Sequence, residues 1–596
     1  MSKGFASNAR MTLLGLGVLS CFVCVAVRLV FLHVVDRDDL LKLIEKARHQ
    51  VVIEHARRGV ILDTHGGLLA ASRPYIELGF DPQVMRPEDE ANWPKLASLL
   101  RLPEAQLAET LRRRPPAVVD GDGRTRPVQY VKICEGLDDK TYDQVQSLHI
   151  RGVYGTRNYR RVYPSGSLAA HVLGYINKEE VPVTGVERHF DLYLRGQDGW
   201  IESEKDGARR ELAQFRSREV PAQDGYDVVL TIDSVIQHMI EEELRHLAAQ
   251  YSPNFATIIV SDPATGAILG LASHPTFDLN EFNKVSFEVQ RNRAVTDVIE
   301  PGSTFKIVPA SAALNEQLVT PVSSFDCGSP TVVYHGRTLR LSKDDHPFQT
   351  LTVADIVAHS SNRGAAHLGL LLGENRLYDY VRRFGFGQPT GFPLGGEVRG
   401  LLEPPSRWDG LTITRLPMGH AVAATPLQIH YAMSVIANGG VLLRPQLVKE
   451  IRDPTGAVVR RMVPEIRHRV LATSTAATMA QLLAKVASAE GTAPEAAIPN
   501  FEVAGKTGTT QKIIDGKYSS TRHVASFIGF FPASRPEVVL SVIVDDAKMP
   551  HGGIAYGKAV AAPAFKRIGE QLVQYLDIKP VSGVRRNYFA VEGGAR

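Results

Sequence analysis

The chain has 596 residues, of which 44% are hydrophobic and 22% charged, a composition that excludes disordered and collagen-like proteins. Its 68 basic and 64 acidic residues give a net charge of +4, which offers no electrostatic basis for nucleic-acid binding. The 4 cysteines are too few for a disulfide framework. Two lie in the apolar N-terminal segment, so Cys134 and Cys327 are the only possible pair outside it. We expect both to be free thiols.

The N-terminal segment is the part of the chain with extreme composition. No charged residue occurs from Met11 to Val27, and apolar character continues to Val35. A stretch of about 25 residues can span a hydrocarbon core of about 30 Å. A cleaved signal peptide is one alternative, but its apolar region is shorter and ends at a small-residue cleavage site. A lipoprotein signal at Cys21 is another, although the apolar run continues beyond it. We therefore expect an uncleaved membrane anchor within residues 1–36, while loop charge leaves its orientation open.

The residues after the anchor predict an irregular, β-rich module over 37–225. Residues 36–56 read as an amphipathic helix running into a strand, with Leu40, Leu43 and Ile44 on one face. Residues 58–70 predict two strands joined by a turn at Gly66-Gly67. Residues 86–115 look helical with a break near Pro103, and the remainder up to 225 is rich in Gly, Pro and Arg.

A second domain is predicted over residues 226–576, followed by a tail at 577–596. Its strands are predicted at 227–232, 256–261, 267–272 and 538–544, and its clearest helices at 237–250 and 561–576. The strands therefore come from both ends of the domain. We expect an α+β multi-domain protein, with a transmembrane helix, a β-rich pedestal, and a domain whose central antiparallel sheet is flanked by helices.

The first candidate motif is Ser303-Thr-Phe-Lys306, which follows Glu300-Pro301-Gly302. Pro and Gly before an apolar run predict a helix start, and positions i and i+3 share a helix face. A lysine kept neutral by burial and by other cations can act as the base for a neighbouring serine. Taken alone, S-x-x-K occurs by chance in many long proteins.

Two further motifs follow in the same predicted domain. Ser360-Ser-Asn362 comes after an expected helix at 352–359 and offers a hydroxyl for proton relay and an amide for holding a peptide group. Alone it more often caps a helix or a turn. Gly505-Lys506-Thr507-Gly508-Thr509 follows strand-like residues 501–504.

On an edge strand, Lys506 would supply positive charge, and Thr507 and Thr509 would offer hydroxyls to a carboxylate. A small Gly508 would let a substrate lie against the backbone. The N–H groups of Ser303 and Thr509 could together form an oxyanion hole.

The order S-x-x-K, S-x-N, K-T-G resembles the penicillin-recognising serine enzymes, which include penicillin-binding proteins and serine β-lactamases. Further residues resemble class B penicillin-binding proteins over residues 37 to 576. These are Arg58-Gly59, Ile61, Asp63 and Gly66; Arg161, Tyr163-Pro164, Gly166, His171 and Gly174; Gly185-Val186-Glu187; Asn292–Val295; Thr425–Gln428; Ala437–Gly440; and Ala561–Phe565. Thr64 and His65 depart from the pattern, where arginine and asparagine are common.

The resemblance implies a peptidoglycan D,D-transpeptidase that is inhibited covalently by β-lactams. Ser303 would be the nucleophile and Lys306 its base, with Ser360 and Lys506 relaying protons. Asn362 would hold the donor peptide, and Thr507, Gly508 and Thr509 would bind its terminal carboxylate. Neither a metal nor a cofactor is implied. The Glu300-Pro301-Gly302 lead-in looks more like the division-specific, septal type than the elongation type.

Stem peptides (a D-Ala-D-Ala donor and an amine acceptor), β-lactams, a polytopic glycosyltransferase and division proteins are the implied partners. The implied location is the cytoplasmic membrane, with the amino terminus inside and the catalytic domain outside, in the periplasm. An elongation-type enzyme and a catalytically silent scaffold remain alternatives. A β-lactamase would have no need for residues 37–225, and a β-lactam sensor would need more membrane spans.

Overall fold

The computed structural model describes residues 8–40, 49–116, 118–119, 125–126, 128, 130–205, 211–212 and 218–580. Leu43 and Ile44, and residues 581–596 of the predicted tail, lie outside them. Helix α1 (Asn8–Val30) and a π-helical turn η1 (Phe31–Val35) begin the chain. Together they contain Ala9–Val35, 27 residues with a mean hydropathy of 2.5, which by length and composition can cross a membrane. This agrees with the predicted single anchor.

The chain forms two compact units. The first contains residues up to Arg57 together with Arg73–Arg160 and Gly196–Asp224. One of its sheets has the order β1-β8-β10, with β9 also pairing with β8. The strands are β1 (His49–Glu54), β8 (Gly199–Lys205), β9 (Glu211–Leu212) and β10 (Arg218–Val220). The strand predicted after the amphipathic segment is therefore present as β1.

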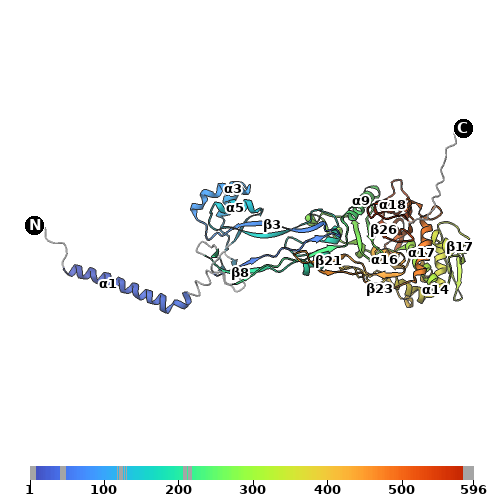
Figure 1. Cartoon of the computed structure of the whole chain (residues 1–596), viewed down its shortest axis with the longest axis horizontal. Helices are drawn as coiled ribbons and strands as arrows, with labels where there is room; N and C mark the ends of the chain where they lie inside the picture. Colours follow the sequence, from blue (N-terminus) through green and yellow to red (C-terminus); the bar gives the residue numbers. More distant parts are fainter. Residues whose placement is uncertain are drawn as a thin grey trace, which may run out of the picture. The chain divides into compact units, whose positions relative to one another are not determined.

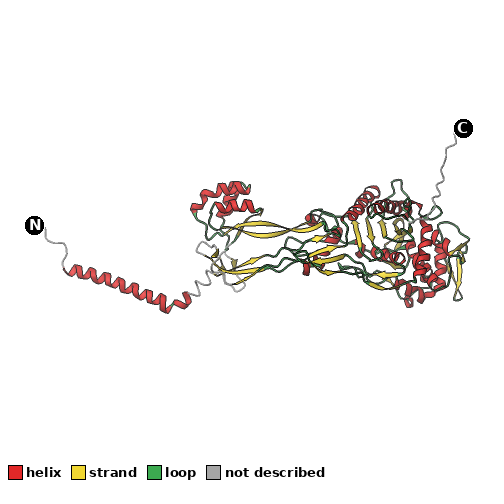
Figure 2. Ribbon diagram, in the orientation of Figure 1, coloured by secondary structure: helices red, strands yellow, loops and turns green. Residues whose placement is uncertain are grey.

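A small helical cluster with its own core completes this unit. Helices α3, α4 and α5 pack over β3 and β6 (Figure 2). The elements are β3 (Leu68–Phe80), η2 (Pro87–Asn92), α3 (Trp93–Leu100), α4 (Glu104–Arg112), β4 (Val118–Val119), β5 (Thr125–Arg126), β6 (Val131–Leu137), α5 (Asp139–Ser147) and β7 (Val153–Val162). The predicted break near Pro103 is confirmed, because this proline lies between α3 and α4 as the N-cap of α4.

The second unit groups Arg58–Ser72 and Arg161–Arg195 with Gly225 and all that follows. Within it, β2 (Ile61–Leu62) pairs with the start of β3 and, in parallel, with β11 (Asp227–Leu230). Strand β11 pairs in turn with β21 (Val448–Arg452), which pairs with β22 (Val458–Arg461). Segments far apart in sequence thus share one sheet. Three short helices accompany it, α6 (Ala170–Leu173), α7 (Gly185–His189) and α8 (Asp191–Leu194).

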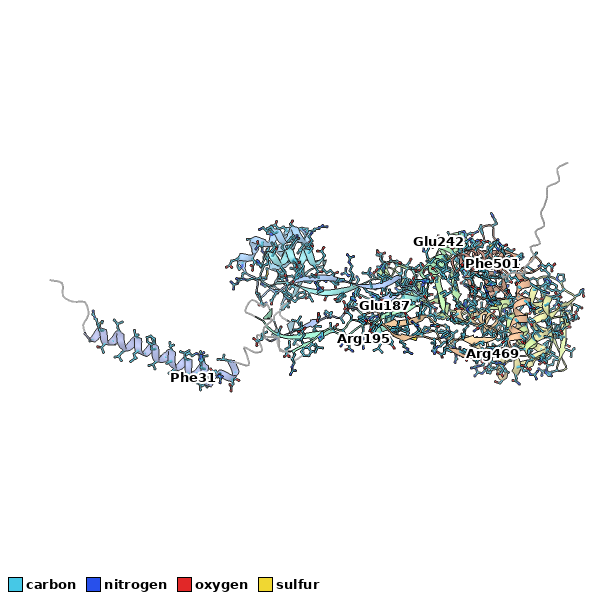
Figure 3. The ribbon with its side chains drawn as sticks, in the orientation of Figure 1. Phe31, Glu187, Arg195, Glu242, Arg469 and Phe501 are labelled. Atoms are coloured by element: carbon cyan, nitrogen blue, oxygen red, sulfur yellow. The ribbon has the colours of Figure 1, made fainter. Side chains whose placement is uncertain are left out.

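Glu187, labelled in Figure 3, joins these segments through buried ion pairs. Its side chain is fully buried, and its two oxygens accept from Arg58 Nε at 2.8 Å and Arg161 Nε at 2.6 Å. Arg58 also donates to Asp191 Oδ1 at 2.5 Å, and the Tyr163 hydroxyl donates to Glu187 at 3.3 Å. A buried carboxylate is stable only when it is paired in this way. Arg58, Arg161, Tyr163 and Glu187 all belong to the motifs quoted above for the family resemblance. They therefore form one hydrogen-bonded charge network.

The two departures from the family pattern also make contacts in this unit. Lys449 Nζ donates to the Thr64 carbonyl at 2.9 Å, and the His65 ring lies 3.0 Å from Asp233 Oδ2. Asp233 caps α9 by accepting from two backbone N–H groups. Thr64 and His65 thus connect the turn after β2 to the domain that follows.

The domain that follows residue 225 is built on a five-stranded antiparallel sheet with the order β13-β12-β26-β25-β24. The strands are β12 (Phe255–Ser261), β13 (Ile268–His274), β24 (Ala504–Ile514), β25 (Lys517–Phe531) and β26 (Val538–Asp545). Every residue of β12 and β26 is buried, which explains their continuous apolar sequence. The predicted sheet from both ends of the domain is confirmed, and β24 lies at its edge.

Helices cover both faces of this sheet. α9 (Ser234–Tyr251) and α18 (Gly557–Tyr575) pack on one face, and α16 (Pro426–Ala437) packs on the other (Figure 1). The remaining helices and helical turns are η4 (Leu279–Lys284), α10 (Phe287–Gln290), α11 (Arg293–Thr296), η5 (Gly302–Lys306), α12 (Ile307–Asn315), α13 (Val353–Ala358), α14 (Asn362–Arg383), η6 (Pro405–Arg407), α15 (Thr412–Arg415), η7 (Leu416–Met418), α17 (Thr473–Ala484), η8 (Lys485–Ala487) and η9 (Pro494–Ala496).

Short strand pairs complete the domain. They are β14 (Ser324–Asp326) with β17 (Thr350–Thr352), β15 (Thr331–Tyr334) with β16 (Arg337–Arg340), β18 (Leu401–Leu402) with β19 (Val422–Ala423), and β20 (Val441–Leu443) with β23 (Ile466–Arg469). The segment between β14 and β17 includes the β15–β16 hairpin and residues 341–349. All four cysteines are free, as predicted for Cys134 and Cys327, and Cys327 is buried.

Candidate active site

Ser303 lies in the tight turn that begins a buried helix. The turn η5 is followed directly by α12, so the predicted helix start is confirmed. Gly302 adopts a φ of 56°, and a Cβ there would lie 2.1 Å from Thr510 Oγ1. Only glycine fits this close approach. Ser303 is partly exposed, and within the described part of the chain its hydroxyl has no hydrogen-bond partner.

Lys306 connects the turn that contains Ser303 to the second motif. Its side chain is 3% exposed, and Nζ donates to the Ser360 carbonyl at 2.5 Å, Ser360 Oγ at 3.2 Å and Asn362 Oδ1 at 2.8 Å. All three acceptors are neutral oxygen atoms. The structure thus brings the first two motifs together around one amine.

Burial lowers the pKa of Lys306 to about 7, although the nearby negative charges of Asp344 and Asp345 act in the opposite direction. Desolvation disfavours the charged form of a lysine. At neutral pH a large fraction of this amine is therefore unprotonated, which is the state that a general base requires.

Asp344 is a site residue that the sequence analysis missed. Its carboxylate is 7% exposed and accepts from Ser361 Oγ at 3.0 Å, from the Asn362 backbone N–H and from the Arg363 backbone N–H. It therefore caps the N-terminus of α14, where backbone N–H groups lack helical acceptors. Residues 327–349 separate β14 from β17, so no local spacing connects Asp344 to the second motif.

The second motif turns sharply before α14. Ser360 adopts a left-handed φ of 60°, and Ser361 Oγ accepts from the Gly364 N–H at 3.0 Å. Asn362 donates its Nδ2 to the Lys343 carbonyl at 2.8 Å while its Oδ1 accepts from Lys306. Both ends of the Asn362 amide are thus fixed.

The third motif lies on the edge strand β24, which begins at Ala504, so the strand-like residues 501–503 precede it. The Lys506 side chain is fully buried, and its nearest acceptor is the Thr507 carbonyl at 3.5 Å. Burial, and next the positive charge of Lys306, hold the pKa of Lys506 well below its usual value. The two lysines thus lie close enough to influence each other's protonation.

Gly508 and Thr509 fit β24 against its neighbours. A Cβ at Gly508 would lie 2.3 Å from Ser526 Oγ and 3.0 Å from Thr304 Cγ2, so this glycine permits close packing against η5. The Thr509 hydroxyl accepts from the Gly557 N–H at 3.0 Å, which leaves its own proton for another acceptor. The Ser303 N–H lies in a first helical turn, where helices leave N–H groups without intrahelical acceptors.

The arrangement combines a free hydroxyl, an amine of lowered pKa and a second buried lysine. Such a set can perform acyl transfer through a serine ester, with a second amine that gains positive charge when an anionic substrate lies beside it. Among the described residues, no group of three or more His, Cys, Asp or Glu side chains could hold a metal ion.

Residues 256–570 match the penicillin binding protein transpeptidase domain, and residues 53–230 match the penicillin-binding protein dimerisation domain. The chain belongs to the class B penicillin-binding proteins, which combine these two domains.

Named relatives extend over nearly the whole chain. Stage V sporulation protein D of Bacillus subtilis is 33% identical over 94% of this chain and 84% of its own length. The probable peptidoglycan D,D-transpeptidase PenA of Neisseria gonorrhoeae is 30% identical over 97% and 95%. The peptidoglycan D,D-transpeptidase FtsI of Escherichia coli K12 is 29% identical over 95% and 92%.

Solved structures agree with this assignment. A peptidoglycan synthetase from Bifidobacterium adolescentis is 26% identical and superposes with a TM-score of 0.73, covering 90% of this chain and 99% of its own. Penicillin binding protein 3 from Mycobacterium tuberculosis, in complex with ampicillin, is 26% identical with a TM-score of 0.68, covering 89% and 98%. The predicted α+β fold is confirmed.

Proposed function

We propose that this protein is a membrane-anchored peptidoglycan D,D-transpeptidase that acts in septal wall synthesis at cell division and is acylated by β-lactams. The observation that carries this proposal is Lys306, an amine with a pKa near 7 on the same turn as Ser303. The names of the PenA and FtsI relatives support the reaction. The Glu300-Pro301-Gly302 lead-in supports the septal role over elongation.

In the first half-reaction, Ser303 Oγ attacks the carbonyl carbon of the penultimate D-alanine. Lys306 accepts the hydroxyl proton, and the developing oxyanion is bound by the N–H groups of Ser303 and Thr509. The peptide C–N bond then breaks as its nitrogen takes up a proton delivered through Ser360 and Lys506. D-Alanine leaves, and an ester between Ser303 and the donor peptide remains.

In the second half-reaction, the amine of an acceptor stem peptide attacks the ester carbonyl. The amine loses a proton, the ester C–O bond breaks, and Ser303 regains its hydroxyl as the cross-link forms. Asn362 holds the donor backbone during both steps. Before D-alanine leaves, Thr507 and Thr509 bind the terminal carboxylate of the donor, beside Gly508. A β-lactam occupies the same positions and leaves a slowly hydrolysed ester.

The apolar helix at Ala9–Val35 supports a location of this reaction at the cytoplasmic membrane. The substrate lies outside that membrane, so we assign the amino terminus to the cytoplasm and the catalytic domain to the periplasm. Residues 37–225 would form the non-catalytic pedestal and residues 226–576 the transpeptidase domain. A polytopic glycosyltransferase and division proteins are the proposed partners of the anchor and pedestal.

The test uses the full chain in detergent, incubated with benzylpenicillin and followed by intact-protein mass over hours. We expect one adduct that persists and is absent from Ser303→Ala. A transient adduct with consumption of the penicillin would identify a β-lactamase instead. No adduct at all would favour the silent scaffold. Depletion in cells tests the division role, because filaments support it and rounded cells would indicate elongation.

A further inference from the structure

The Thr507 hydroxyl has one proton, and the direction of this proton decides whether Thr507 can donate a hydrogen bond to an anionic ligand. Within the described part of the chain, the only hydrogen-bond partner of the Thr507 side chain is Thr492, with 3.3 Å between the two Oγ1 atoms. Either hydroxyl can be the donor in this pair. A hydroxyl offers one proton and two acceptor lone pairs, so the choice of donor matters.

The backbone holds Thr492 firmly on both sides. The Gly491 N–H donates to the Ser488 carbonyl at 3.0 Å, and the Ala493 N–H donates to the Val486 carbonyl at 2.9 Å. Ala493 is fully buried, and a Cβ at Gly491 would lie 2.2 Å from the Lys485 carbonyl oxygen. Residues 488–493, which we call the Thr492 turn, therefore present this hydroxyl to β24 from a fixed position.

The direction of this hydrogen bond determines which of the two hydroxyl protons remains free. Among the described residues, Thr492 Oγ1 has no hydrogen-bond partner other than Thr507 Oγ1. If Thr492 donates to Thr507, the Thr507 proton stays free for a carboxylate. The hydrogen bond from Thr492 then also polarises the hydrogen bond from Thr507 to the carboxylate. If Thr507 donates to Thr492, its proton is unavailable and a bound carboxylate loses a donor.

We propose that Thr492 is a positioning residue that donates to Thr507 Oγ1 and so directs the Thr507 proton at the carboxylate of the donor peptide or β-lactam. This inference rests on the proposed function and adds a residue from outside the three motifs. Thr492 touches no substrate atom in this role, because it acts through Thr507.

The experiment measures the second-order rate constant of acylation of the full chain by benzylpenicillin in detergent. Thr492→Val removes the hydroxyl at nearly constant volume, and we expect a loss of about fivefold to tenfold. Thr492→Ser restores the donor and should keep the rate constant within about twofold of the unmodified protein. Ser488→Ala removes a 2.7 Å hydrogen bond to the Lys485 carbonyl in the same turn without touching Thr507, and should leave the rate constant unchanged.

A double-mutant cycle separates positioning from packing. In a Thr507→Val background, Thr492→Val should cause no further loss, because the hydroxyl through which it acts is gone. An equal loss in both backgrounds, or no loss in either, would overturn the inference. Failure of the unmodified protein to be acylated would overturn the proposed function as well, and is a visibly different result.

Discussion

Two buried charge clusters in the second unit differ in how their charges are compensated. Glu187 is paired with two guanidinium groups, at 2.8 and 2.6 Å. Lys306 contacts only neutral oxygens, and neither it nor Lys506 forms an ion pair with any described residue. A paired buried charge stabilises one arrangement of the chain, whereas an uncompensated one shifts its pKa and becomes reactive. The same fold thus uses buried charge for structure in one place and for chemistry in the other.

The largest effect is expected from removing the reactive amine. Lys306→Met should slow acylation by penicillin by about 10² to 10⁴, the usual contribution of a general base. Its melting temperature should change little, because the loss of three hydrogen bonds is offset by the removal of a buried, partly charged amine. Time-resolved intact mass measures the first quantity and differential scanning fluorimetry the second. An unchanged acylation rate would mean that another group acts as the base.

Disrupting the ion pairs of Glu187 should instead lower the thermal stability of the protein. Glu187→Gln leaves the buried Arg161 without a carboxylate partner and Arg58 with Asp191 alone, which is expected to cost about 3–5 kcal/mol of stability. The matched control is Glu465→Gln, because Glu465 pairs with Arg444 at 3.0 Å on the exposed surface and such pairs contribute little. Thermal unfolding of both variants decides the comparison. Equal melting temperatures would show that the Glu187 network is not needed for stability.

A third change concerns Asp344, a buried carboxylate whose negative charge acts on Lys306. Asp344→Asn removes the oxygen that accepts from the Ser361 hydroxyl and a negative charge near Lys306, so we expect acylation to fall about tenfold. The charge of Asp344 raises the pKa of Lys306, so its removal should lower that pKa further. The acid limb of the pH–rate profile should therefore move to lower pH. A shift to higher pH would contradict this account.

The unmodified protein should show the smallest effect, a pH dependence of acylation. Lys306 must be neutral to accept the Ser303 proton, and its pKa is about 7. The rate constant should therefore rise about tenfold between pH 6 and pH 8 and then level off. Stopped-flow measurements with a chromogenic cephalosporin over this range provide the test. A flat profile would mean that proton acceptance by Lys306 does not limit acylation.

The sequence predicted what is local and missed what depends on distant contacts. Each of the three motifs was predicted on a helix start, a turn or a strand, because short-range signals such as Pro301-Gly302 determine these elements. Asp344 could not be predicted, because its partners Ser361 and Asn362 are reached only through the folding of residues 327–349. The local sequence Lys343-Asp344-Asp345 resembles any solvated loop.

The role of Gly508 in packing was also not predictable from the sequence. The sequence suggested that Gly508 is small so that a substrate can approach β24. The structure adds a requirement from the protein itself, since Ser526 and Thr304 occupy the space of a side chain at this position. Likewise, the pairing of Arg58 with Glu187 joins residues 129 positions apart, and hydrophobic periodicity cannot reveal such a pair.

The burial of Lys506 has a consequence for proton balance during binding. A carboxylate placed beside this amine favours its charged form and raises its pKa, so ligand binding should draw a proton from solution. Ser303→Ala allows this to be seen without acylation. Calorimetric titration of that variant in two buffers of different ionisation enthalpy should give different apparent heats, and the difference counts the protons taken up. Lys506 would then take up a proton from solution each time an anionic ligand binds.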